Sequence, residues 1–255
     1  MTNPKFAKTG RAGRTYTVPD GTGRTVELPS VTTILNIVNK PAIAGWAARS
    51  VAEYAVHNHA LIHTMLEEND TDNAIKLLKG SPWTTRDKAA DIGSQVHALI
   101  EQYVLGQEVA PTETEQLYFQ GFLDFVSDFP SLHFESAEVT VYNLTYGYAG
   151  TTDAIVMFGG KRGIHDWKTR QGKTAASLEV YETERLQLAA YAHAERFLLD
   201  DGTTGEMGRV DGAALVLLGI DGYRLGPVDL EQDWPAFLHA LHLYQWKKAL
   251  DGRQD

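Results

Sequence analysis

The segment Gly163-Ile-His-Asp-Trp-Lys-Thr-Arg170 joins the apolar start of a β-strand to an acid and a base two residues apart. Side chains at positions i and i+2 of a strand point to the same face. We therefore expect Asp166 and Lys168 to project together, and Trp167 to point to the opposite face. Burying two charges is costly unless they pair with each other or serve a site. The segment thus indicates either a structural ion pair or a functional site.

The residues around this segment predict a sheet covered by helices. The run 213–218 is apolar on both faces, as in a central strand with helices on each side. Enrichment in Val, Ile, Tyr and Leu between turn residues predicts strands at 134–142, 147–158, 163–169 and 211–220. Two helices, at about 178–199 and 231–250, are expected to interrupt and close this region.

The N-terminal part predicts a hairpin followed by helices. Residues 14–30 alternate and turn through Pro19–Gly23, and Ser30 or Thr32 is a suitable cap for a short helix. Further helices are expected from Pro41 to about Leu66 and at about 71–79, 84–105 and 112–128. We expect one α/β domain over residues 1–255, with a hairpin and helical portion at 1–130 and an α/β core at 131–255.

Composition limits the class of protein. The chain has 255 residues, 43% of them hydrophobic, and no cysteine, so any metal is held by oxygen and imidazole, which favours Mg²⁺ or Mn²⁺. No apolar window approaches the length of a membrane span and no targeting segment is evident, so we expect a cytoplasmic protein without membrane contact. The net charge of -10 argues against nucleic-acid binding over the whole surface. The segment from Lys161 to Lys173, however, contains five basic residues and only one acidic residue. This composition is typical either of local polyanion binding or of a solvated basic loop.

A second acid lies at the start of the preceding strand, in Gly150-Thr-Thr-Asp153, thirteen residues before Asp166. Strands joined through Gly159-Gly160 would bring Asp153 and Asp166 side by side. Paired carboxylates repel unless they share a proton or a cation, and a hard divalent metal satisfies both. Lys168 would then orient a water or stabilise charge on phosphorus. Taken singly, Asp153 also fits an ordinary strand-end aspartate.

Gly-x-x-Asp153 followed by Asp166-Trp167-Lys168 resembles the active site of the PD-(D/E)xK nuclease superfamily, with threonine in place of the name-giving proline. Gln187-Leu-Ala-Ala-Tyr191 is similar to the Q-x-x-x-Y motif of its RecB-like branch, and Gly93-Ser-Gln-Val-His97-Ala-Leu-Ile-Glu101 is similar to that branch's upstream helix. As motifs these are weaker, because a helix border often carries Gln and Tyr and a single helical His is often structural.

The resemblance implies a restriction-endonuclease-like mixed sheet and a set of site residues. The implied ligands of Mg²⁺ or Mn²⁺ are His97, Asp153, Asp166 and the main-chain carbonyl of Trp167. Lys168 is the implied catalytic lysine, supported by Gln187 and Tyr191, with Glu101 and Glu138 as accessory residues. Arg170, Lys173 and Arg185 are expected to face phosphates. Pro29-Ser-Val-Thr-Thr-Ile-Leu35, followed by the helix around Trp46, is similar to the opening of the phage-encoded exonucleases of this branch, although an ordinary cap and core helix also explains it. Relatives with an iron–sulfur cluster use four cysteines, which this chain lacks, so no cluster is expected.

The resulting hypothesis is a metal-dependent exonuclease acting on duplex DNA ends in phage recombination or DNA processing inside a bacterial host. A single-strand annealing protein is an expected partner, and the sequence leaves an oligomer open. Replacing Asp166 or Lys168 by alanine is expected to abolish cleavage and leave folding intact. An endonuclease or resolvase, a non-catalytic module that binds DNA ends, and a hydrolase of small nucleotides remain alternatives.

Overall fold

The computed structural model describes residues 4–251, except for the side chains of residues 41–42 and 85–89. The chain divides into two compact units, Met1–Val38 with Gly93–Asp255, and Asn39–Ile92. This division differs from the boundary expected at residue 130. The strands of residues 131–255 lie in the same unit as the N-terminal hairpin and the helices at 31–35 and 113–128, which contact them.

The N-terminal hairpin is confirmed and belongs to a three-stranded antiparallel sheet. Its strands lie in the order β1 (Ala7–Gly10), β2 (Gly13–Pro19) and β3 (Thr25–Pro29). Tyr16 and Val18 are buried, as the strand period requires. Ser30 caps helix α1 (Val31–Leu35), because its Oγ accepts a 3.0 Å hydrogen bond from the Thr33 N–H.

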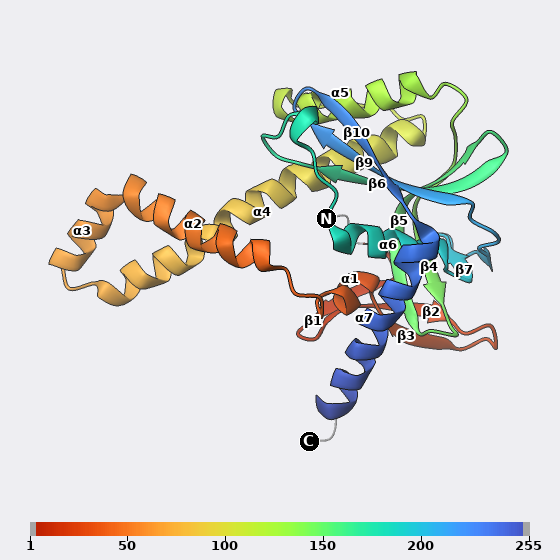
Figure 1. Cartoon of the computed structure of the whole chain (residues 1–255), viewed down its shortest axis with the longest axis horizontal. Coiled ribbons are helices and arrows are strands. Elements are labelled where there is room, and N and C mark those ends of the chain that lie inside the picture. Colours follow the sequence, from red (N-terminus) through yellow and green to blue (C-terminus); the bar gives the residue numbers. More distant parts are fainter. Residues whose placement is uncertain (1–3, 252–255) are drawn as a thin grey trace. The chain divides into compact units, whose positions relative to one another are not determined.

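A seven-stranded mixed sheet forms the centre of the first unit (Figure 1). Strands β6 and β9 pair in parallel, and the other neighbouring strands pair antiparallel. The α/β class and the mixed sheet predicted from the sequence are thereby confirmed. In spatial order the strands are β10 (Gly222–Val228), β9 (Gly212–Gly219), β6 (Lys161–Thr169), β5 (Tyr148–Phe158), β4 (His133–Asn143), β7 (Arg196–Leu198) and β8 (Thr204–Glu206).

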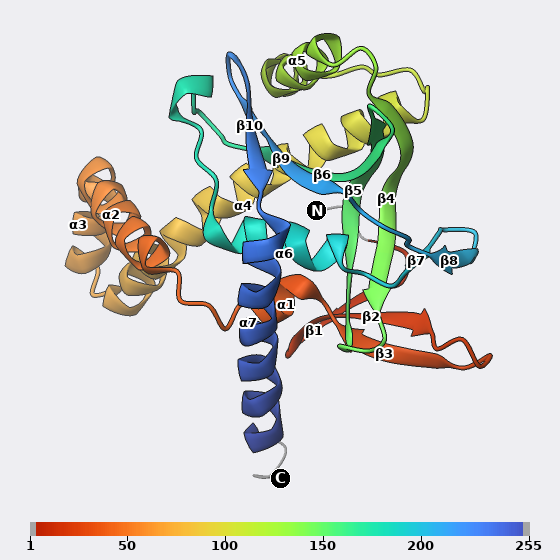
Figure 2. The ribbon, with the colours of Figure 1, turned by 45° about the vertical axis from the view of Figure 1, so that its right-hand side comes forward.

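Helices cover both faces of this sheet (Figure 2). Helix α5 (Glu113–Asp128) packs on β9 and β10, and its Phe122 and Phe125 rings lie 5.3 and 5.9 Å from the Trp167 ring. On the opposite face, α6 (Glu182–Ala192) packs on β5, β6 and β9 and against α7 (Leu230–Asp251). Trp167 thus points toward α5, whereas Asp166 points toward Gln187 of α6. This confirms that the two side chains lie on opposite faces of the strand, as predicted.

The second unit is helical, with α2 (Pro41–His57), α3 (His59–Glu67) and the first part of α4 (Thr71–Val104). The single helix expected up to Leu66 is interrupted at Asn58. The two helices expected at 71–79 and 84–105 are one helix, which continues through Pro82. Proline cannot donate to the carbonyl four residues earlier, but the Ser81 hydroxyl donates to the Leu78 carbonyl at 2.9 Å. This bond replaces the missing backbone donor.

The helix expected at 178–199 is shorter than predicted. It spans only Glu182–Ala192, and Phe197 and Leu198 form β7 opposite Val141 and Thr140 of β4. This pairing satisfies the backbone at the edge of the sheet, which a continued helix would leave open. Strands β1, β7, β8 and β10 were not predicted.

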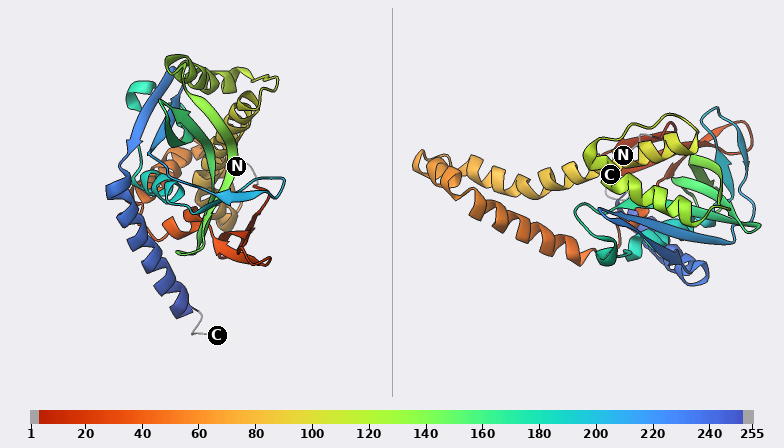
Figure 3. Two further views of the ribbon diagram at one scale, coloured as in Figure 1. Left: turned by 90° about the vertical axis from the view of Figure 1, so that its right-hand side faces the viewer. Right: turned by 90° about the horizontal axis from the view of Figure 1, so that it is seen from above.

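The C-terminal part of α7 extends past the remainder of its unit (Figure 3). Phe237 and Leu241 are buried in the core, whereas Leu243 and Trp246 are 48% and 61% exposed. None of the helices in the described part of the chain combines the length and the apolar character needed to cross a bilayer.

Candidate metal and acid–base site

The site begins where strands β5 and β6 separate. Their ladder ends at the pair Ala154 and His165, although β6 continues beside β9 as far as Thr169. The backbone of Trp167 lies beyond the last pair, and buried backbone groups need other partners there. The Trp167 N–H donates to Asp153 Oδ2 at 2.7 Å, and the Trp167 carbonyl accepts from His97 Nε2 at 2.8 Å. Two predicted site residues therefore bind the backbone of a third.

Three side chains form a group that can hold a metal ion. One ligand atom from each of His97, Glu138 and Asp153 lies within 4.8 Å of the other two. The three residues come from α4, β4 and β5. Glu138, predicted only as an accessory residue, is thus a member of the group. Asp166, predicted as a ligand, is not in it.

Glu138 also has an unusual backbone. Its φ of 50° lies in the left-handed region, although the pairs on either side of it, Ala137 with Ala154 and Val139 with Thr152, are kept. A non-glycine residue in this region costs on the order of 1 kcal/mol. The strain therefore coincides with a carboxylate of the metal-ligating group.

Asp166 and Lys168 form an ion pair, with side chains that are 2% and 20% exposed. They share one face of β6, which answers the question that the sequence raises. Asp166 Oδ1 accepts a long hydrogen bond of 3.4 Å from Gln187 Nε2, while buried Oδ2 has the Lys168 ammonium beside it but accepts no hydrogen bond of good geometry. Gln187 also donates to Tyr191 Oη at 3.0 Å.

Charge and burial act together on the protonation of the site. Burial lowers the pKa of His97, but the neighbouring Asp153 carboxylate, 3.5 Å from Nδ1, outweighs it and raises this pKa to about 9. Burial raises the pKa of Asp153, and the His97 charge reverses the shift, so that this pKa is lowered. Burial and the Asp153 charge raise the pKa of Asp166 to about 6. The Lys168 pKa is raised, because Asp166 and Asp153 outweigh burial.

Gly150 makes room for Tyr191. A Cβ atom on Gly150 would lie 2.3 Å from Tyr191 Cε1, well inside contact distance. The strand carrying Asp153 therefore approaches the helix carrying Gln187 more closely than alanine would permit. Burial raises the pKa of Tyr191 well above its ordinary value, so its hydroxyl stays neutral.

Four predicted residues, Glu101, Arg170, Lys173 and Arg185, belong neither to the metal-ligating group nor to the contacts of Asp166 described above. Glu101 is partly buried, and its pKa is raised by burial and by the charge of Asp200. Two of the three basic residues expected to face phosphates are paired instead: Arg170 with Glu184, and Arg185 with Asp233 at 3.0 Å. Lys173 is exposed.

Glu184 was missed in the sequence. It is buried on α6, and its charge is one of those that raise the pKa of Lys168. Glu184 lies three residues before Gln187, hence on the same helix face, and this spacing was the available signal.

The donor set fits a hard divalent cation. An imidazole and two carboxylates suit Mg²⁺ or Mn²⁺, and the chain has no thiolate for a soft metal or an iron–sulfur cluster. Asp166 Oδ2, buried without a well-aligned donor, adds an oxygen whose charge is offset by Lys168 and His97. The residues present therefore fit the predicted kind of metal.

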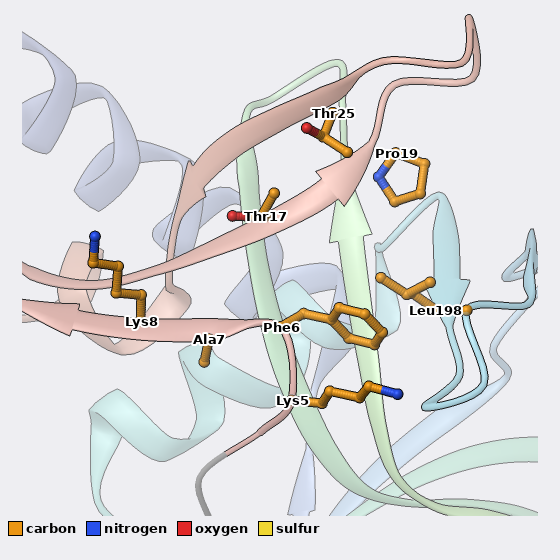
Figure 4. Close-up of a pocket in the computed structure, with 9 residues that line it drawn as sticks. Lys5, Phe6, Ala7, Lys8, Thr17, Pro19, Thr25 and Leu198 are labelled. Carbon is orange, nitrogen blue, oxygen red and sulfur yellow. The ribbon is translucent and has the colours of Figure 1, made fainter.

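A hollow of about 390 Å³ lies elsewhere in the same unit, between the three-stranded sheet and the segment around β7 (Figure 4). Phe6, Pro19 and Leu198 contribute its apolar lining, and Lys5 and Lys8 are also among the residues that line it. No residue of the metal-ligating group lines it.

Neither a protein-family model nor a curated protein matches the chain. Among solved structures, "Crystal structure of SSO0001" is similar over 81% of this chain and 86% of that one, with 14% identity and a TM-score of 0.36. A likeness this distant carries no argument about function.

Proposed function

We propose that this protein is a metal-dependent deoxyribonuclease of the PD-(D/E)xK type, with a restriction-endonuclease-like core, that hydrolyses phosphodiester bonds at DNA ends. The observation that supports it most is the convergence of His97, Glu138 and Asp153 beside the buried Asp166–Lys168 pair. A purely structural ion pair does not account for a second buried acid and a histidine at the same strand ends.

The chemistry follows from the donor set. A bound Mg²⁺ or Mn²⁺ would polarise a phosphoryl oxygen and lower the pKa of a water. His97 would release its proton when such an ion binds, because only the neutral imidazole is a ligand. Lys168, held by Asp166, is placed to orient the attacking water or to stabilise charge on the phosphate. Gln187 and Tyr191 fix the Asp166 carboxylate from α6.

The remaining parts of the proposal concern substrate, partner and location. Duplex ends, a single-strand annealing partner and a role in phage recombination follow from the resemblance of the motifs. The proposed cytoplasmic location follows from the composition of the sequence. The net charge of -10 favours contact with DNA confined to the site rather than spread over the surface. Lys173, which is exposed after β6, is the remaining basic residue proposed to face phosphate.

Digestion of end-labelled duplex DNA with Mg²⁺, with and without chelator, tests the proposal. We expect cleavage that requires the metal and starts from ends. A circular substrate run in parallel separates an exonuclease from an endonuclease, because only an endonuclease opens circles. DNA binding without metal-dependent cleavage would favour the non-catalytic module and overturn the proposal.

A further inference from the structure

Arg170 and Glu184 make a close and mostly buried contact. Arg170 Nη2 donates to Glu184 Oε1 at 2.7 Å and to Oε2 at 2.6 Å, and the two side chains are 13% and 11% exposed. The guanidinium carbon also lies 4.4 Å from the centre of the Tyr181 ring. The hydrogen bonds to Glu184 come from Nη2 alone, and Nε is buried without an acceptor among the described residues. The Glu184 carboxylate offsets the charge of the guanidinium, which weakens its attraction for a phosphate.

Glu184 is at the same time part of the start of α6. The Tyr181 N–H donates to Glu184 Oε2 at 3.1 Å, which satisfies a backbone donor at the helix terminus. One carboxylate therefore fixes where α6 begins and binds the residue that follows β6. The helix start and the strand end are joined through this single side chain.

The pair lies beside a second contact between the same two elements. Asp166 and Arg170 are four apart along β6 and its end, and Gln187 and Glu184 are three apart on α6. The Gln187 to Asp166 distance of 3.4 Å is close to the limit of a hydrogen bond, so a small shift of α6 away from β6 would break it. The shorter Arg170–Glu184 contact is the stronger of the two and sets their spacing.

We propose that Arg170 and Glu184 are positioning residues that hold α6 against β6, so that Gln187 keeps the Asp166 carboxylate oriented beside Lys168. The inference rests on the proposed nuclease function. It replaces the expectation that Arg170 binds phosphate. Residues that act as one unit give non-additive effects when they are substituted together.

The test is a kinetic cycle with Arg170→Gln, Glu184→Gln and the double variant on end-labelled duplex DNA. We expect each single variant to lower kcat about tenfold with KM changed less than about twofold, and the double variant to be no worse than either single one. Arg170→Lys, which keeps the charge, is expected to recover part of the loss. A raised KM in Arg170→Gln with normal Glu184→Gln kinetics would overturn the proposal and return Arg170 to phosphate binding.

A matched control is Glu135→Gln, which removes a carboxylate that accepts from Arg162 Nε at 2.6 Å on β6, near the opposite end of the strand. Its kcat is expected to stay within about twofold of the original, since this pair does not join β6 to α6. An equal loss of kcat in this control would show a general effect of destabilisation and refute the positioning role.

The failure of the proposed function is distinguishable from the failure of this inference. If the original protein cleaves no DNA, the nuclease proposal fails, and the same cycle is read by urea unfolding instead. Non-additive shifts of the unfolding midpoint together with an altered Gln187 side-chain amide NMR signal in both single variants then support the bridge. Additive shifts, or an unchanged Gln187 signal, contradict it.

Discussion

Replacing Gly150 by alanine tests the close approach of β5 and α6. The new Cβ would lie 2.3 Å from Tyr191 Cε1 and 2.9 Å from both Cζ and Oη. Carbon atoms in favourable contact are about 3.5–4.0 Å apart, so the ring or the strand must retreat by about 1.2 Å or more. Tyr191 is only 3% exposed, and protein interiors are close-packed, so such a movement must displace neighbouring side chains.

Two effects of different size follow. Overpacking of this kind costs about 1–3 kcal/mol, which lowers the melting temperature by about 2–12 °C in a protein of this size. The Tyr191 hydroxyl accepts from Gln187, which in turn contacts Asp166, so the retreat also disturbs the site. A displacement of about 1 Å in a catalytic group can reduce the rate about 100-fold.

Calorimetry and the DNA cleavage assay measure the two effects separately. Gly212→Ala is the matched control, because a Cβ there meets nothing within 4 Å, and we expect unchanged activity and a stability within about 1 kcal/mol of the original. In a Tyr191→Ala background the cost of Gly150→Ala should vanish. If Gly150→Ala melts and cleaves like the original protein, the argued contact between β5 and α6 does not exist.

Three further predictions concern the charged groups. Asp166→Ala should abolish cleavage and also destabilise the protein by about 3 kcal/mol, contrary to the sequence-based expectation of intact folding, because it leaves the Lys168 ammonium without its buried partner. Urea unfolding measures this loss, and the double variant Asp166→Ala with Lys168→Met should be less destabilised. Equal stability of the original protein and both variants would contradict the buried pair. Because the His97 pKa is raised to about 9, protonation of His97 stabilises the metal-free protein fully below pH 6.5, and this contribution of at most about 3 kcal/mol is lost as the pH rises through about 9. Unfolding in chelator across this range should show the decline in the free energy of unfolding, and His97→Gln should flatten it. Glu138→Gly should raise the free energy of unfolding by about 1 kcal/mol, because glycine relieves the left-handed backbone strain, and it should weaken Mn²⁺ binding at least tenfold. Calorimetry measures both effects, and an unchanged Mn²⁺ affinity would remove Glu138 from the metal-ligating group.

Local sequence patterns predicted the elements that depend on local geometry. The strands β4, β5, β6 and β9 followed from their apolar runs, and Ser30 was one of the two candidate caps, with Thr32, before the first helical pattern. The strand β7 could not be predicted in this way, because three residues become a strand only when β4 lies beside them. Continuation of α4 through Pro82 depended on a single hydroxyl that happens to reach the open carbonyl.

The site divides along the same line. The sequence by itself determined that Asp166 and Lys168 share a face of β6 and that Trp167 does not, because a strand alternates its side chains whatever surrounds it. Only the tertiary structure decided that Glu138 joins His97 and Asp153, and that Arg170 pairs with Glu184. These contacts join separate helices and strands, and their distances are set by how α4 and α6 pack against the sheet, which no local pattern encodes.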